Sequence, residues 1–370
     1  MFFWRMLGLW LTLVLLAACA GVSAAPPLTS KQLKLYGFSE YIPQDLLTGF
    51  EKSAGVEVVY ETYSNNEEML SGLTAKPGNY DLLIPSDYAV EILINQDKLQ
   101  PLNLAQIPNY NNIDPAFLSP YFDPGGDTEG RRPALRNQKF SLPYQWGTTG
   151  ILYNPAKVSE PITRWEDLWR PELAGHVVAL DDPRELMGLT LLTLGYDKNE
   201  TNPARLAEAR DKLKKLAPGV IAFDSATPED YLLSGDAWAG VVFNGNAALA
   251  ARQNPDLSYV LPAEGAGIWF DNLVIPADAS HPDAAVAFIN YVLQPENSIL
   301  ITREFPYSNP NEAALNYLKT KDANLYAGYI GSPASNPSPD ALAGAHLVKN
   351  VGPQTSALYE QYWAEVKSSR

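Results

Sequence analysis

Acidic residues follow several apolar segments of this 370-residue chain, and aromatic residues stand beside most of them. They gather at four places in the sequence, namely Phe38–Tyr41, Ser86–Tyr88, Asp181–Glu185 and Trp269–Asp271. Carboxylates suit an organic cation because they accept charge-assisted hydrogen bonds from ammonium groups. Aromatic faces attract the same charge by about 0.5–2 kcal/mol each, and they cover methylene groups at about 0.8 kcal/mol per CH₂. Acids on four separate loops therefore predict a site able to hold a long polyamine at both ends.

Each of these residues also has a simpler structural explanation when it is considered alone. Asp182 precedes Pro183, which is typical of a residue that caps the N-terminus of a helix. Ser86 stands in the same relation to a helix that begins near Tyr88. Aromatic residues at strand ends belong to a core more often than to a ligand site. The prediction of a cation site therefore depends on the coincidence of the four loops.

The elements that must position these loops alternate between strand and helix. In the first part of the chain we predict strands over 33–37, 56–62 and 82–85 and helices over 46–51, 65–75 and 88–97. The pattern resumes after a first half that ends near 144–147, with strands that include 150–153, 176–180, 220–223, 240–243, 259–261 and 273–275 and helices over 185–194, 204–216, 283–293 and 356–366. This alternation predicts an α/β fold with a largely parallel sheet. Ligands bind such sheets at the carboxyl ends of the strands, where the loops lie.

The composition argues against several other functions. A formal net charge of −15 disfavours binding to nucleic acid or to an anionic lipid surface. The single cysteine, Cys19, and three separated histidines offer neither a disulfide nor a zinc site. No nucleotide-binding or nucleophile-elbow motif occurs, and Asp182 and Glu185 stand too close in sequence for a glycosidase acid pair. We therefore expect no cofactor, no metal, no nucleic-acid partner and no catalytic activity.

The N-terminus has the pattern of an export signal. Arg5 is followed by an apolar run over 6–18 that is shorter than a membrane span. The run ends in Leu16-Ala17-Ala18-Cys19, which resembles a bacterial lipobox. We predict that residues 1–18 are a signal peptide, that Cys19 is acylated as the first mature residue and that residues 19–30 are a flexible tether. The alternative is ordinary cleavage after Ala24, and either route places the protein in the periplasm or outside the cytoplasm.

Several stretches in order resemble the spermidine/putrescine-binding proteins of bacterial ABC transporters, from about Leu33 to the last helix. These stretches are Gly37–Pro43, Tyr80–Tyr88, Trp165–Glu172, Asp181–Glu185, Phe243–Gly245, Ile268–Asp271 and Leu358–Tyr362. The resemblance implies a two-lobed periplasmic-binding-protein fold of type II. In this fold each lobe is a mixed, mostly parallel sheet flanked by helices, and the ligand binds in the cleft between the lobes. It places residues 31–146 and 271–315 in lobe one, and residues 147–270 and 316–370 in lobe two.

The resemblance also implies which residues contact a ligand. They are Phe38, Ser39, Glu40, Tyr41, Ser86, Tyr88, Asp182, Glu185, Phe243, Trp269, Asp271 and Tyr307. The chain departs from the family at Phe38 and Phe243, where tryptophan is usual, and at Val348, where spermidine binders carry glutamine. Asn246 takes the place of an acid found in some putrescine binders. These departures leave the preferred polyamine open.

The expected function is that of an exported, lipid-anchored, monomeric polyamine receptor. The ligand, putrescine or spermidine, would bind between the lobes and be delivered to the subunits of an ABC permease, with no membrane contact other than the anchor. Two alternatives remain at this point. The same scaffold could bind a sugar or another organic cation, because aromatic rings and acids also suit those ligands. An exported hydrolase could use Asp182 or Glu185 as an acid or base.

Overall fold

The computed structural model describes residues 28–125 and 132–370. The predicted signal peptide, Cys19 and most of the predicted tether lie outside the described residues. The described chain begins with Leu28, and the hydroxyl groups of Thr29 and Ser30 donate hydrogen bonds to the Asp283 carboxylate. The backbone N–H of Thr29 donates to the same carboxylate at 2.9 Å. This contact fixes the start of the described chain to the beginning of a helix near the end of the sequence.

Strands and helices alternate along the chain, as the sequence predicts. The strands are β1 Gln32–Phe38, β2 Glu57–Tyr63, β3 Leu82–Leu83, β4 Ser141–Tyr153, β5 Val177–Ala179, β6 Val220–Phe223, β7 Ala239–Phe243, β8 Ser258–Val260, β9 Gly267–Val274 and β10 His346–Leu347. The helices are α1 Gln44–Ala54, α2 Asn66–Ala75, α3 Asp87–Asn95, α4 Pro183–Thr193, α5 Pro203–Leu216, α6 Pro228–Ser234, α7 Asn244–Gln253, α8 Pro282–Val292, α9 Pro295–Glu304, α10 Glu312–Lys321, α11 Ala323–Gly331, α12 Pro339–Leu342 and α13 Pro353–Lys367.

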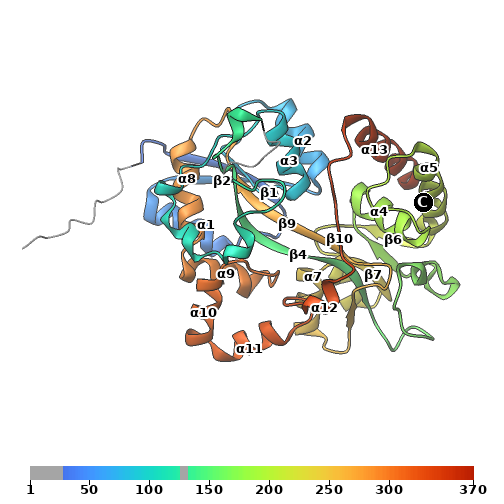
Figure 1. Ribbon diagram of the computed structural model, residues 1–370. Helices are drawn as coiled ribbons and strands as arrows, with labels where there is room; N and C mark the ends of the chain where they lie inside the picture. The colour runs from blue at the N-terminus through green and yellow to red at the C-terminus, as the bar shows by residue number, and fades with distance from the viewer. Residues whose placement is uncertain (1–27, 126–131) are drawn as a thin grey trace, which may run out of the picture.

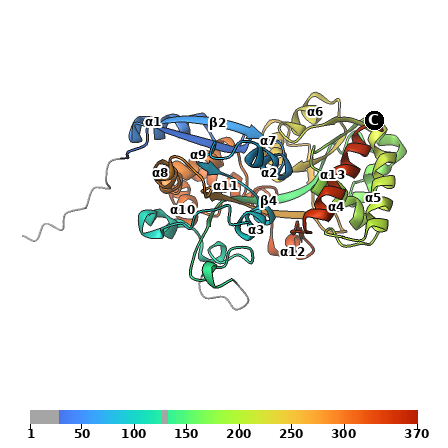
Figure 2. The same cartoon turned by 90° about the horizontal axis from the view of Figure 1, so that it is seen from above.

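The strands follow the order β2-β1-β3-β9-β4-β7-β5-β6, with β10 beside β9 and β8 beside β4. At one end β1 pairs in parallel with β2 and β3, and at the other end β5 pairs in parallel with β6 and β7. Between them β4 and β9 form an antiparallel pair. Figure 1 shows this pair running between two groups of helices, α1, α2, α3 and α8 on one side and α4, α5 and α13 on the other. The turned view of Figure 2 shows α1 and α8 toward one end of the molecule, α4, α5 and α13 toward the other, and α2 and α3 between them.

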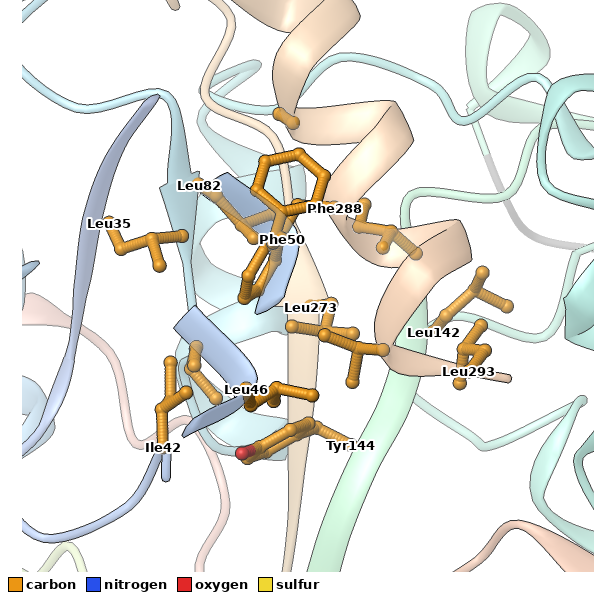
Figure 3. Close-up of a cluster of buried hydrophobic side chains, with 14 of the residues drawn as sticks. Leu35, Ile42, Leu46, Phe50, Leu82, Leu142, Tyr144, Leu273, Phe288 and Leu293 are labelled. Atoms are coloured by element: carbon orange, nitrogen blue, oxygen red, sulfur yellow. The ribbon is translucent and has the colours of Figure 1, made fainter. Parts of the chain in front are cut away.

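Each group of helices covers an apolar core, and a separate apolar cluster lies under α2 and α3 in the first group. In the first core Leu46 and Phe50 of α1 are buried, and the Phe50 ring packs nearly perpendicular to Phe288 of α8, with 5.0 Å between ring centroids. Figure 3 shows these rings above Leu273 of β9. The second core joins α4, α5 and α13, and it includes the fully buried Tyr359. Two cores on either side of one strand pair leave the loops between them to form a site.

The central strands are longer than the sequence predicts. We predicted strands over 150–153 and 273–275, whereas β4 begins at Ser141 and β9 begins at Gly267. Nearly every residue of β4 is buried, so the strand lacks the polar alternation by which half-exposed strands are recognised. Pro143 interrupts the pattern further, and the pairing register shifts beside it. The predicted end of the first half, at 144–147, lies inside β4.

Candidate functional site

A cavity of about 160 Å³ lies between the two groups of helices. Its lining comes from the ends of β1, β2, β3, β5 and β6 and the residues that follow them, from β7 and β9, and from the segments after α9 and β10. Eleven of the twelve predicted site residues line it, namely Phe38, Ser39, Tyr41, Ser86, Tyr88, Asp182, Glu185, Phe243, Trp269, Asp271 and Tyr307. Glu40 does not line the cavity: it lies in the turn after β1 with a φ of 49°, and it is exposed. The loops at the carboxyl ends of the strands therefore meet as the α/β pattern predicts.

Both oxygens of the Asp271 carboxylate accept a hydrogen bond within the cavity. The Tyr41 hydroxyl donates to its Oδ2 at 2.5 Å, and the Ser86 hydroxyl donates to its Oδ1 at 2.6 Å. The residue is 3% exposed. Burial raises the pKa of Asp271 to about 7, although both hydrogen bonds act to lower it. Ser86 stands at the N-cap position of α3 but makes no capping bond, because its hydroxyl is directed to Asp271 instead. The cap predicted from the sequence for Ser86 is therefore wrong.

Asp182 serves as a helix cap and as part of the cavity lining. Its Oδ1 accepts the backbone N–H groups of Arg184 at 2.8 Å and Glu185 at 2.9 Å, which satisfies two free donors of the first turn of α4. Burial, together with the charges of Glu67 and Glu185, raises the pKa of Asp182 to about 8. The cap considered for this residue is therefore present, and the same side chain lines the cavity.

Glu185 is held by a lysine that the sequence analysis did not connect with the site. The Lys198 ammonium donates to both oxygens of Glu185, each at 3.0 Å, and both residues are buried. Lys198 lies in the polar segment between α4 and α5, which has the composition of a solvated loop. Only the folded chain brings this lysine beside the helix that carries Glu185.

Arg184 bridges the two groups of helices above the cavity. Its guanidinium carbon lies 5.3 Å from the ring centroid of Tyr88 in α3 and 4.7 Å from that of Tyr359 in α13. The Tyr88 hydroxyl donates to Glu67 at 3.0 Å. The Nε and Nη1 atoms of Arg184 are buried without a hydrogen-bond partner in the described residues. The Arg184 guanidinium therefore contacts both halves of the molecule, through Tyr88 of α3 on one side and Tyr359 of α13 on the other.

Aromatic rings form a continuous row along the cavity. Ring centroids are separated by 5.5 Å between Phe38 and Tyr41, 5.3 Å between Tyr41 and Tyr307, 5.6 Å between Tyr307 and Trp269, and 5.7 Å between Trp269 and Phe243. Each pair is T-shaped, which is a favourable arrangement for aromatic quadrupoles. The row supplies an apolar surface on which a hydrocarbon chain can lie.

The row depends on two glycines that leave room for its rings. A Cβ atom on Gly147 would lie 2.6 Å from the Trp269 ring, and one on Gly245 would overlap the Tyr307 ring. The Trp269 indole N–H is buried and has no acceptor in the described residues. One ring of the row therefore keeps an unused hydrogen-bond donor beside the cavity.

Asp87 is the acid of the predicted loop Ser86–Tyr88, but the resemblance did not include it among the residues that contact a ligand. It is fully buried and lines the cavity. One oxygen accepts the backbone N–H of Tyr88 at 2.8 Å, and Oδ2 has no hydrogen-bond partner in the described residues. Burial raises the pKa of Asp87 well above its usual range. Acid residues right after a buried strand were the available signal, but the family motif directed attention to Ser86 and Tyr88.

Fold and cavity together define a solute-binding protein, in which two α/β parts enclose a small ligand between them. The chain belongs to the family of bacterial extracellular solute-binding proteins, whose model matches residues 45–327. It is 36% identical to the spermidine/putrescine-binding periplasmic protein of Salmonella typhimurium, over 96% of this chain and 97% of that protein. It is 31% identical to the putrescine-binding periplasmic protein of Escherichia coli, over 96% of each chain.

A solved structure extends the comparison to three dimensions. The spermidine/putrescine ABC transporter substrate-binding protein of Streptococcus pneumoniae is 34% identical to this chain, with a TM-score of 0.69 over 92% of this chain and 99% of that one. The family resemblance and the two-lobed α/β fold predicted from the sequence are thereby confirmed. No helix in the described ranges has the length and apolar character needed to cross a membrane. Within the same ranges, no group of three or more His, Cys, Asp or Glu side chains could hold a metal ion.

Proposed function

We propose that this protein is an exported receptor that captures a polyamine of the putrescine or spermidine class and delivers it to an ABC permease. The observation that carries the proposal is Asp271, a buried carboxylate oriented by Tyr41 and Ser86 at one side of a row of aromatic rings. A ligand ammonium would pair with this carboxylate, and the rings would cover the methylene groups next to it. The names of the relatives support the same ligand class.

The mechanism we propose is closure of two lobes about the crossing strands. Lobe one comprises residues 31–146 and 271–315, and lobe two comprises residues 147–270 and 316–370. Ligand binding between the lobes would stabilise the closed form, which the permease then distinguishes from the open form. Contacts between the halves support this assignment: Asn65 donates to the Asp181 carbonyl at 3.1 Å, and Arg184 stacks on Tyr88.

The hydrolase alternative finds little support at the acids it requires. Asp182 is engaged as the cap of α4, and Glu185 is engaged by Lys198. A general acid or base needs a free carboxyl group within reach of the reacting atoms. We therefore propose a binding function without catalysis. A neutral sugar would leave the buried Asp271 carboxylate without a countercharge, which is unfavourable at this degree of burial.

Isothermal titration calorimetry on the chain without its signal peptide tests this function. We would titrate putrescine, spermidine and spermine at physiological salt, followed by a neutral disaccharide and glycine betaine. One-to-one binding of a polyamine at micromolar affinity or better, about −8 kcal/mol, is the expected result. Absence of heat with every polyamine, on protein shown by circular dichroism to be folded, would contradict the proposal, and heat with the disaccharide alone would replace it with sugar binding.

A further inference from the structure

The ion pair between Glu185 and Lys198 is unusual because it lies at the end of a ligand cavity. The Lys198 side chain is 2% exposed and the Glu185 side chain is 6% exposed. One ammonium contacts both carboxylate oxygens at 3.0 Å. A primary ammonium of a ligand would make the same contacts with a free glutamate. Glu185 therefore already holds the kind of group that the cavity is built to receive.

Two contacts within its own half of the molecule fix Lys198 in this place. The Tyr359 hydroxyl contacts the backbone carbonyls of Lys198 at 3.3 Å and Glu200 at 3.1 Å, which holds the segment between α4 and α5. The aliphatic stem passes over Gly188 of α4, where an added Cβ atom would lie 2.7 Å from Cγ of the lysine. The lysine is thus preorganised by the core of its own half of the molecule and needs no ligand to order it.

The pair lies on the same strand face as the rest of the site. Gly267, Trp269 and Asp271 alternate along β9, so that they share one face of the strand. A Cβ atom on Gly267 would lie 2.8 Å from the Lys198 ammonium and from Glu185 Oε2. At about 3.4 Å per residue, the internal ammonium lies roughly 14 Å along the strand from the Asp271 position, with Trp269 between them.

The buried acids and bases around the cavity determine how many ligand ammonium groups it can accommodate. Four acids that line it are at least nine-tenths buried, namely Asp87, Asp182, Glu185 and Asp271, and Arg184 is a buried base of the same lining. Lys198 adds a second buried base through Glu185. Lys198 neutralises one carboxylate of this set, so Glu185 has no free charge to offer a ligand ammonium. Because a buried ammonium group is costly without a counterion, an acid that is already paired reduces the number of ligand ammonium groups that the cavity suits.

We propose that Lys198 is a specificity-determining residue: its ammonium acts as a built-in cation on Glu185, so that the cleft takes a diamine in preference to a longer polyamine with more charges. This inference rests on the proposed function, because it ranks ligands within the polyamine class. It assigns putrescine-like diamines as the preferred ligands and makes Glu185 unavailable to a third ammonium.

Calorimetry with putrescine and spermidine tests the proposal on three proteins. The unchanged protein should bind putrescine at least tenfold more tightly than spermidine. Lys198→Met frees the Glu185 carboxylate, and it should raise the affinity for spermidine relative to putrescine by at least tenfold. The double variant Glu185→Gln with Lys198→Met removes both charges, and it should keep the ligand ratio of the unchanged protein. Lys215→Met, at an exposed position of α5, is the matched control and should leave both affinities unchanged.

Each outcome separates this inference from the proposed function. A preference of the unchanged protein for spermidine, or an unaltered ratio in Lys198→Met, would overturn the role of Lys198 and leave polyamine binding intact. If the double variant also gained affinity for spermidine relative to putrescine, the space taken up by the Lys198 side chain, rather than its charge, would set the preference. That result would also overturn the proposal. Binding of no polyamine by the unchanged protein would overturn both. Should Lys198→Met fail to fold, Lys198→Gln removes the same charge while keeping a hydrogen-bond donor for Glu185, and an unaltered ligand ratio in that variant would overturn the proposal.

Discussion

The Asp271 carboxylate is deeply buried and accepts two hydrogen bonds, and a bound ammonium group would supply a positive charge beside it. Replacing it by alanine would leave a ligand ammonium in the cleft without its counterion, which is costly at this burial. We expect Asp271→Ala to weaken polyamine binding at least tenfold, about 1.4 kcal/mol or more. Titration calorimetry measures this, with Asp236→Ala at an exposed position as the control. An unchanged affinity in Asp271→Ala would remove Asp271 from the site.

The raised pKa values of the cavity acids predict that binding depends on pH. Burial raises the pKa of Asp271 to about 7 and that of Asp182 to about 8, against about 4 in an unfolded chain. A ligand cation favours the charged carboxylates, so binding should release protons and weaken as the pH falls from about 8 to about 6. Calorimetry in two buffers with different ionisation enthalpies would measure the proton release. Equal affinity at both pH values, with no buffer dependence, would contradict this assignment.

The same two acids affect the free protein in the opposite direction. Because their pKa values are higher in the folded state than in the unfolded state, their contribution to stability is complete below about pH 4 and is lost as the pH rises through 7–8. A bound polyamine compensates for the charged carboxylates in that upper range. The increase in melting temperature caused by a polyamine should therefore be larger near pH 8 than near pH 6.

Residue types predicted most of the site, but they could not show which acids are already engaged. Much of the cavity lining lies at or just after the ends of strands, and strand ends can be located from local hydrophobic patterns. Lys198 and Glu67 could not be found in this way, because their contacts with Glu185 and Tyr88 are made only in the folded chain. Glu40 illustrates the converse: it stands inside a site motif, yet a left-handed turn leaves it outside the cavity.

At the level of elements, α7 supports the aromatic row through a residue without a side chain. Gly245 lies in the first turn of α7, where any Cβ atom would overlap the Tyr307 ring. We expect Gly245→Ala to lower the free energy of unfolding by about 1–3 kcal/mol. Displacement of Tyr307 should also weaken polyamine binding severalfold.

Thermal unfolding and calorimetry together check this expectation. Gly331→Ala is the matched control, because no atom lies within 4 Å of the position that its Cβ would take. In this control the free energy of unfolding should change by no more than a few tenths of a kcal/mol, and the affinity for polyamine should stay the same. If Gly245→Ala behaved like Gly331→Ala, the close packing of α7 against Tyr307 would not matter for binding.

Several helices and short buried strands were located from the sequence, whereas the full length of the two central strands was not. The helix α5 alternates buried Leu206, Ala209 and Leu213 with charged residues, so its periodicity is visible in the sequence. Nearly every residue of β4 is buried, and β9 alternates only in its first half before a run of buried residues, so neither shows a regular alternation along its whole length. Their pairing across the centre of the molecule is a property of the whole fold, and it could not be read from either segment alone.

For the whole molecule, the predicted lipid anchor gives a direct test. We expect the full-length protein, expressed in a bacterium with lipoprotein processing, to partition into the detergent phase of a Triton X-114 extraction. Cys19→Ser should release it into the aqueous phase without changing polyamine affinity, because Cys19 stands apart in sequence from the residues of the cavity. Recovery of both proteins in the aqueous phase, with the N-terminus at Ala25, would establish cleavage after Ala24 instead.

The contact of Thr29 and Ser30 with Asp283 has a consequence for how such a receptor would stand on a membrane. It ties the start of the described chain to the N-terminus of α8, in the half that also contains α1. Nine residues, 20–28, stand between Cys19 and Thr29 in the sequence. If Cys19 is acylated as we expect, the lipid would hold the half that contains α1 and α8 close to the membrane, and the half that contains α4, α5 and α13 would be the one that moves on closure. Ligand binding would then be detected at the membrane as the movement of that one half, while the anchored half stays in place.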